Sequence, residues 1–344
     1  MNRWLTLPDK TKRSAYIQVG EEVGVSAFAV EKDWWVVQAL ACIFELEAAQ
    51  HIVFKGGTSL SKAWQLIHRF SEDIDLAIDR TFFGYDDNLT RGQRTALRRK
   101  AGAYTTGPFL QELQNKFADK GLTGVNWEVV GAEARDQDPR ILEMYYPNLI
   151  EGPGYLAPRV RIEIGCRSLR EPYTTKSISS FLDDTYLDRD FAHEPVLVPT
   201  VNPERTFLEK IFLLHEEFHR PLDKIRVANL SRHLYDVYQL SQTDFCSFAL
   251  ASQDLYATIV DHRYHFLRVG GVDYNRHQPQ FINPLPVSEV DDAYRTDYAR
   301  MREEMIYEGS PPSYEELMQG LSRLRERINA LSWRFKTQYP RVKQ

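Results

Sequence analysis

Cysteine is scarce in this sequence. Three occur among 344 residues, Cys42, Cys166 and Cys246, and no two of them form a CxxC pair. An odd, widely spaced set favours neither a disulfide framework nor a cysteine-rich zinc site, and it fits a reducing compartment. No apolar run approaches the ~20 residues of a membrane span. The N-terminal segment MNRWLTLPDKTKR lacks the apolar core of a secretory signal. The sequence therefore predicts a cytoplasmic protein without a membrane segment.

An excess of positive charge is also absent. The 43 Lys and Arg residues stand against 48 Asp and Glu, which leaves a formal net charge of −5. Contact with nucleic acid would therefore need a local basic surface. Hydrophobic residues make up 43% and charged residues 26%, an ordinary globular composition. At roughly 150 residues per domain, the length predicts about two domains.

The first part of the chain predicts a helix followed by a short strand. Apolar residues recur at spacings of three and four over residues 26–46, which is typical of one buried helix face. The run HIVFK, residues 51–55, is short and apolar and ends at Gly56 and Gly57. We therefore expect a strand that leads directly into a glycine turn.

A second helix and a second strand are predicted after this turn. Thr58 and Ser59 are favoured N-cap residues, and SLSKAWQLIHR, which ends at residue 69, is the helix that they would open. Residues 70–79 (FSEDIDLAID) alternate charged and apolar side chains at their centre. That period of two predicts a half-buried strand.

Beyond residue 80 the patterns predict an α+β fold. The expected elements are a polar helix over 91–120 interrupted at Gly102 and Gly107-Pro108, strands over 127–130 and 159–164, and a linker punctuated by Pro195, Pro199 and Pro203. After this linker the chain is mainly helical in pattern. We expect a mixed-sheet lobe over residues 1–200 and a mainly α-helical lobe over 201–344.

Two aspartates in the second strand suggest chemistry. Asp73 and Asp75 are two residues apart, so both project from the same face of the strand. Like charges at this spacing repel, and Mg²⁺ typically takes one or two carboxylates together with substrate phosphates. Gly56 and Gly57 let main-chain amides approach a phosphate closely. The alternative is that the aspartates are solvated residues of a strand and that the glycine turn is an ordinary one. Because the aspartate pair and the glycine turn occur together in one strand-turn-helix-strand segment, the sequence favours phosphoryl or nucleotidyl transfer.

The same segments resemble a known family. GGTSLSK followed by RFSEDIDL is similar to the signature of the nucleotidyltransferase AbiEii/AbiGii toxin family, within the DNA-polymerase-β-like nucleotidyltransferase superfamily. VEKDWWV, RTFLEKIFLLHEE, SRHLYDVYQL and DYARMREEMIYEGSPPSYEELM resemble further parts of that family. One departure is the 15 residues between Gly57 and Asp73, more than the general superfamily pattern allows.

The resemblance implies roles for individual residues. It implies a triphosphate held by Gly56, Gly57, Thr58 and Ser59, two Mg²⁺ ions (or Mn²⁺) bound by Asp73 and Asp75, and a third carboxylate from Glu163. A solvated strand glutamate is the alternative for Glu163. Lys210 matches the family's motif lysine and would contact the triphosphate, and Asp236 matches the aspartate of its YD motif. Asp236 would orient Lys210 or the nucleotide.

The function implied by the resemblance is nucleotidyl transfer. An NMP would be transferred from an NTP to an RNA acceptor, with release of pyrophosphate. The favoured acceptor is the 3′ end of tRNA. Such an enzyme would be a toxin that blocks translation, with a cognate antitoxin protein as its partner. A catalytically weak nucleotide- or RNA-binding protein on the same fold is the alternative; degenerate copies often lose one aspartate, and both are present here.

A zinc protease is a further alternative. His215 and His219 belong to an HExxH sequence, the helical zinc-protease signature. Leu222 and Ile225 stand where metzincins have their glycine and third histidine, and Pro221 predicts the end of the helix. Helical geometry also turns Lys210 away from both histidines. The pattern therefore favours packing over metal binding.

Overall fold

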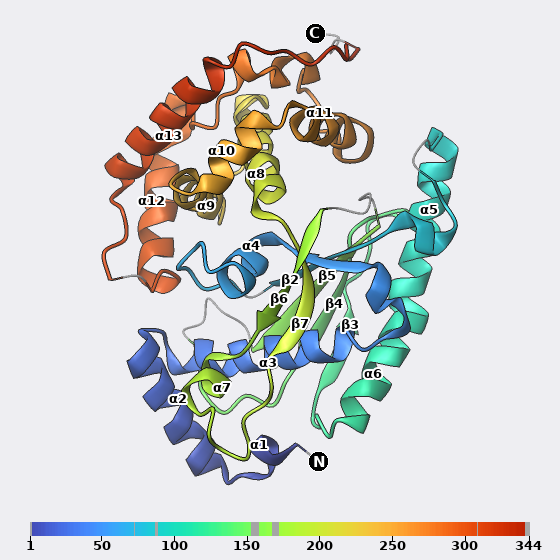
Figure 1. Ribbon diagram of the computed structural model, residues 1–344, viewed down its shortest axis with the longest axis vertical. Helices are drawn as coiled ribbons and strands as arrows, with labels where there is room; N and C mark the ends of the chain where they lie inside the picture. The colour runs from blue at the N-terminus through green and yellow to red at the C-terminus, as the bar shows by residue number, and fades with distance from the viewer. Residues whose placement is uncertain are drawn as a thin grey trace. The chain divides into compact units, whose positions relative to one another are not determined.

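The structure is a computed structural model of the chain (Figure 1). It describes residues 2–71, 73–86, 89–152, 158–166, 172–307 and 309–340. The chain divides into two compact units, the first made of Met1–Gln65 and Phe70–Val201, and the second of Leu66–Arg69 and Asn202–Gln344. The short segment Leu66–Arg69 thus belongs to the second unit, while both of its neighbours in sequence belong to the first. Across the described ranges, no helix has the length and hydrophobicity to cross a membrane.

The first unit contains a mixed sheet, as predicted. Its described residues form seven strands in the order β3-β4-β5-β2-β1-β7-β6. The strands are β1 (Ile52–Lys55), β2 (Asp73–Ile78), β3 (Asn126–Val129), β4 (Arg140–Tyr145), β5 (Arg159–Gly165), β6 (Tyr173–Ile178) and β7 (Val196–Val201). At the centre, β1 runs antiparallel to β2, whereas β2 is parallel to β5 and β1 is parallel to β7.

Helices accompany the sheet in the first unit. They are α1 (Arg3–Thr6), α2 (Asp9–Val23), α3 (Ala27–Ile43), α4 (Gly56–Thr58), α5 (Arg91–Tyr104), α6 (Leu110–Asp119) and α7 (Phe181–Thr185). The predicted helix over residues 26–46 is α3; its N-cap Ser26 accepts a hydrogen bond from the Ala29 amide. Nearly all of α3 is buried, and Figure 1 shows it crossing the strands of the sheet.

The two faces of the central strands differ in chemistry. Apolar side chains of β1 and β2 enter the main core together with α3: Ile52, Phe54, Ile74, Leu76 and Ile78. Because side chains alternate along a strand, Asp73, Asp75 and Ala77 lie on the opposite face. There Ala77 packs with Val53 and Val201 in a separate small cluster. We call this second face, which carries the aspartates, the open face.

The predicted helix over SLSKAWQLIHR is mostly wrong. The helical segment begins at Gly56 with α4, continues as a π-helical turn over Ser59–Ala63, and ends there. Gln65 has a positive φ of 54°, which ends any helix. Thr58 and Ser59 are likewise not N-caps, because the N-cap position belongs to Lys55.

Two proline-containing segments also differ from the prediction. The expected linker around Pro199 is strand β7, in which Pro199 stands opposite Thr175 of β6. Proline removes a donor from a strand ladder, which is why the sequence pattern favours a linker here. The expected break at Pro108 is a π-helical turn, Thr105–Phe109, through which α5 continues into α6. Strands β4 and β6 carry no clear alternation and are not predicted.

The second unit is mainly helical, as predicted. Its helices are α8 (Pro203–Phe218), α9 (Ser231–Ser241), α10 (Asp244–Ala251), α11 (Gln253–His262), α12 (Ser288–Glu304) and α13 (Tyr314–Asn329). Proline at the first position of α8 loses no helical hydrogen bond, since that amide has no partner in a helix. Helix α8 packs against α9, α10 and α11.

The motif VEKDWWV is a structural element of the first unit. Asp33 forms an ion pair with Lys62 at 2.9 Å and accepts the Phe181 amide at 2.8 Å. Two residues earlier, Glu31 accepts the main-chain amides of Leu149 and Ile150 at 2.8 and 3.0 Å. These buried carboxylates attach loops and the segment after the glycine turn to α3.

We predict that Asp33→Asn lowers the free energy of unfolding by about 3 kcal/mol, because it leaves the Lys62 ammonium without its carboxylate in a nearly dry site. Chemical denaturation measures this loss. The exposed pair of Asp223 and Lys224 provides the control, since Asp223→Asn should cost less than about 1 kcal/mol. Equal losses for the two variants would contradict a structural role for the buried pair.

Candidate functional site

The backbone of the glycine turn lies close to the Asp75 side chain. Lys55, the last residue of β1, stands opposite Asp75 in the β1–β2 register. Gly56 follows with φ +80°, and a Cβ at this position would lie 1.9 Å from Oδ2 of Asp75. No residue with a side chain fits there without moving the carboxylate.

Two buried hydroxyl groups fasten this turn. The Thr58 hydroxyl donates to the main-chain carbonyl of Asp73 and lies 3.0 Å from the Ser71 hydroxyl. The Ser59 hydroxyl donates to the Gly56 carbonyl at 2.9 Å. The Thr58 hydroxyl therefore holds the turn against β2, and the Ser59 hydroxyl stabilises the turn itself. A phosphate at this turn would meet main-chain amides of the first helical residues, which lack partners within the helix.

Three carboxylates that the sequence singles out lie on two neighbouring strands. Asp73 and Asp75 are half-buried on β2, and Glu163 stands beside Asp75 on the parallel strand β5. Arg161, which stands beside Asp73, forms an ion pair with Glu163 at 3.1 Å between Nε and Oε1. In this arrangement the described part of the chain holds no group of three or more Asp, Glu, His or Cys side chains placed to hold a metal. Glu163 would have to leave Arg161 to join the two aspartates.

Lys210 and Asp236 meet in the second unit. The Lys210 ammonium lies 2.9 Å from Oδ2 of Asp236 and 3.4 Å from Nδ1 of His233. Arg69 donates to both oxygens of the same carboxylate, each at 2.7 Å. Asp236 is fully buried, and Arg69 and Lys210 are nearly so. One buried carboxylate is thus shared by two cations.

Burial and charge oppose each other in this cluster. Burial alone would raise the pKa of Asp236, but the charges of Arg69 and Lys210 outweigh it and hold the pKa well below its usual range. Burial lowers the pKa of the Lys210 ammonium, and the Asp236 carboxylate opposes that shift. The ionised carboxylate favours the charged ammonium that phosphate binding requires.

From the sequence, Arg69 lies beside the glycine turn and could contact a phosphate or be solvated; its pairing with Asp236 is not predicted. The unusual spacing between Gly57 and Asp73 is the sequence feature that indicates an additional role for this segment. The 15 residues between Gly57 and Asp73 include Leu66–Arg69, the segment that belongs to the second unit. In that unit the His68 amide donates to the Tyr235 hydroxyl at 3.3 Å, one residue before the contact of Arg69 with Asp236.

The HExxH sequence builds a packed ion cluster. Glu216 accepts two hydrogen bonds from Arg263, at 2.8 and 2.6 Å, and one from His277 at 3.1 Å. Burial would raise the pKa of Glu216, but Arg263 overcomes it and lowers the pKa to about 2. His215 accepts the Asn283 amide at 3.1 Å, and His219 bonds the His215 carbonyl at 2.7 Å. The contacts with Arg263 and His277 occupy the Glu216 carboxylate that a zinc protease would need as its general base, so they favour the packing interpretation.

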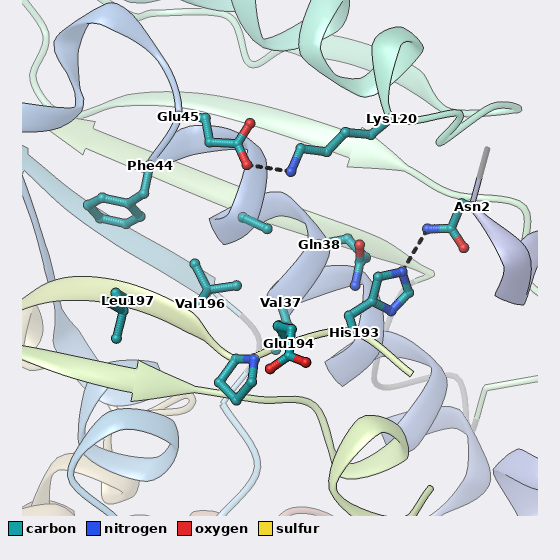
Figure 2. Close-up of a pocket in the computed structure, with 12 residues that line it drawn as sticks. Asn2, Val37, Gln38, Phe44, Glu45, Lys120, His193, Glu194, Val196 and Leu197 are labelled. Atoms are coloured by element: carbon teal, nitrogen blue, oxygen red, sulfur yellow. Dashed lines mark hydrogen bonds and ion pairs between the residues drawn. The ribbon is translucent and has the colours of Figure 1, made fainter. Parts of the chain in front are cut away.

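A cavity of about 550 Å³ lies elsewhere in the first unit. Figure 2 shows residues of α3 on one side of it and the start of β7 on the other. The figure also shows Glu45 paired with Lys120, and Asn2 bonded to His193. The predicted site residues, all within the described part of the chain, do not line this cavity.

The comparisons with known proteins give the class of the molecule first: it is a nucleotidyltransferase. The model of the family described as "Nucleotidyl transferase AbiEii toxin, Type IV TA system" matches residues 38–320. The chain therefore belongs to the AbiEii nucleotidyltransferase toxin family, which confirms the resemblance. Membership implies a nucleoside triphosphate substrate and an antitoxin partner.

Among solved structures, the chain is similar to JHP933 from Helicobacter pylori, with 13% identity over 87% of this chain and 91% of that one, and a TM-score of 0.41. MenT4, a nucleotidyltransferase toxin from Mycobacterium tuberculosis, has 17% identity over 94% of this chain and 98% of its own, also with a TM-score of 0.41. Among curated proteins, none matches the sequence.

We predict that Gly56→Ala lowers nucleotidyl transfer by about 100-fold, because the new methyl group displaces the Asp75 carboxylate or the turn by about 1 Å or more. A labelled-NTP transfer assay measures the loss. Gly84→Ala is the matched control: Gly84 has nearly the same φ, +79°, but an added Cβ meets nothing within 4 Å. Both variants should lose roughly 1–2 kcal/mol of stability from backbone strain. Activity that falls equally in both would contradict the role of the contact with Asp75.

We also predict that the protein loses stability as the pH falls below about 6.5, the pKa of an unperturbed histidine. Burial, with His219 and Arg276 nearby, keeps the pKa of His215 well below this value, and burial also lowers the pKa of His277. The unfolded chain therefore binds more protons than the folded chain below pH 6.5, and the folded state loses about 1.4 kcal/mol per group and pH unit.

Thermal unfolding between pH 7.5 and 5.5 tests this. His215→Asn keeps an acceptor for the Asn283 amide but cannot be protonated, so stability should fall less steeply with pH than in the wild type. His265→Asn, at a partly exposed histidine outside the cluster, should leave the slope unchanged. If stability depends on pH equally steeply in His215→Asn and in the wild type, His215 is not buried in its neutral form.

Proposed function

We propose that the protein transfers an NMP from an NTP to an RNA acceptor, with the 3′ end of tRNA as the acceptor that we favour. The observation that supports this most strongly is the contact between Gly56 and Asp75 on a face with two further carboxylates. A phosphate-binding turn and metal-binding carboxylates must adjoin for in-line displacement at an α-phosphate. Here a single glycine forms that junction.

The donor set suits Mg²⁺. Asp73 and Asp75 offer hard carboxylate oxygens from one half-buried strand face, and Glu163 is the third donor if it exchanges Arg161 for the metal. When bound, Mg²⁺ would neutralise the charge of the phosphates and lower the pKa of the attacking hydroxyl. Mn²⁺ has the same ligand preference.

The protein's own groups would bind and orient the triphosphate. Gly57 and Thr58 offer main-chain amides at the start of the helical turn, and Gly56 leaves room for the phosphate to approach. We propose Lys210 as a further triphosphate contact. Asp236 would position it, because its carboxylate, 2.9 Å away, holds the ammonium in one place.

We propose that the nucleotide added to the acceptor prevents aminoacylation, and that a cognate antitoxin protein neutralises this activity in the cytoplasm. A catalytically weak binding protein on the same fold is the second candidate. It is disfavoured because the glycine turn, both aspartates and the Lys210–Asp236 ion pair are all intact.

The test is transfer of each α-labelled NTP to total tRNA with Mg²⁺. We expect labelled tRNA with the wild type, none after chelation by EDTA, and a loss of about 10³-fold in Asp75→Asn, which corresponds to roughly 4 kcal/mol of transition-state stabilisation. Asp86→Asn, at an exposed carboxylate outside the site, should retain full activity. Equal labelling by wild type and Asp75→Asn would contradict the metal assignment. No labelling of any RNA by the wild type would contradict the acceptor.

A further inference from the structure

A second cavity, of about 260 Å³, is lined by residues of the open face. Val53 and Ala77, which stand opposite each other in the β1–β2 register, line it together with Pro199 of β7 and Tyr173 of β6. We call it the sheet-face cavity. Its remaining lining comes from Ile52 and from polar residues that precede β1 and follow β2, namely Gln50, His51, Asp79 and Thr81.

The sheet-face cavity adjoins the proposed metal-binding carboxylates. Asp75 and Ala77 are two residues apart on β2 and point to the same face, so their Cα atoms are about 7 Å apart. On β1, Val53 likewise stands two residues before Lys55, the partner of Asp75. A molecule in the cavity would therefore lie about 7 Å along the strand from Asp75.

The lining has the chemistry that holds a flat aromatic ring. Val53 and Ala77 are 8% and 2% exposed and pack with Val201, so they form an apolar floor. Tyr173, an aromatic residue that is 38% exposed, also lines the cavity. The volume lies below the range of about 300–1,000 Å³ typical of pockets for drug-sized ligands, which suits a single heteroaromatic group.

Polar groups stand at the rim. The Asp79 carboxylate accepts the Thr81 amide through Oδ1 at 2.9 Å, and a carboxylate has further lone pairs for a second donor. The His51 ring is half-buried beside Phe82, with a ring-to-ring distance of 5.2 Å, and its nitrogens can donate or accept. An apolar floor, an aromatic side and a polar rim match a nucleobase, which has apolar faces and a polar edge.

We propose that the sheet-face cavity binds a nucleobase of a nucleotide that reacts at Asp73 and Asp75. This inference rests on the proposed function. The base belongs either to the 3′-terminal nucleotide of the acceptor RNA or to the NTP, and the same contacts, stacking on Tyr173 and hydrogen bonds at the rim, would serve both.

Steady-state kinetics with NTP and tRNA varied separately test the proposal. Tyr173→Ala should raise one KM about tenfold, which lies within the roughly 5- to 150-fold that stacking of a base on an aromatic ring contributes. Tyr173→Phe keeps the ring and should resemble the wild type. Leu197→Ala is the control, because Leu197 is an exposed apolar residue of β7 that does not line the cavity.

The two KM values distinguish the source of the base. A raised KM for tRNA assigns the cavity to the acceptor end, and a raised KM for the NTP assigns it to the incoming nucleotide. Both KM values within twofold of the wild type in Tyr173→Ala would overturn the proposal. Tyr173 lies on an exposed edge strand, so the variant should fold, which its thermal unfolding verifies.

A binding measurement separates this proposal from the proposed function. The wild-type protein is irradiated with 4-thiouridine triphosphate, or with an RNA that ends in 4-thiouridine, and the cross-linked peptide is sequenced. Cross-links to peptides with Tyr173 or His51 support the cavity even if no RNA is labelled in the transfer assay. Transfer by the wild type with cross-links only to other peptides would overturn the cavity and leave the transferase intact.

Discussion

The close approach of the Gly56 backbone to the Asp75 carboxylate is the constraint on which the site depends. It requires a glycine with positive φ at the end of β1, and it requires β1 and β2 to be paired so that Lys55 meets Asp75. Thr58 adds a hydrogen bond to the Asp73 carbonyl. The turn and both aspartates are therefore positioned together, and a shift in one displaces the others.

Much of this arrangement follows from local sequence patterns. The strand over residues 51–55, the glycine turn, and the shared face of Asp73 and Asp75 depend on alternation and on glycine, which are properties of a few consecutive residues. The helix predicted after the turn was wrong because its outcome is decided at long range. Arg69 binds Asp236, which is 167 residues away in sequence, and helical propensity carries no information on such a partner.

Two motifs with acidic residues on helices both hold the fold together in the structure. In VEKDWWV, Glu31 and Asp33 hold main-chain amides and Lys62, so this part of the family resemblance reflects support of the fold. In HExxH, Glu216 is bound by Arg263 and His277 instead of facing a metal. Only the contacts of each side chain show whether a polar residue in a helix performs chemistry or holds neighbouring elements in place.

The membership of Leu66–Arg69 in the second unit has a consequence for how the sequence can evolve. The chain leaves the first unit after Gln65, returns at Phe70, and leaves again after Val201, so no single cleavage or crossover point separates the two units. A gene fusion that exchanged residues 202–344 for those of a relative would retain Arg69 but replace Asp236. The two sequence segments that form the second unit are thus expected to evolve together, with substitutions at Arg69 and Asp236 coupled to each other.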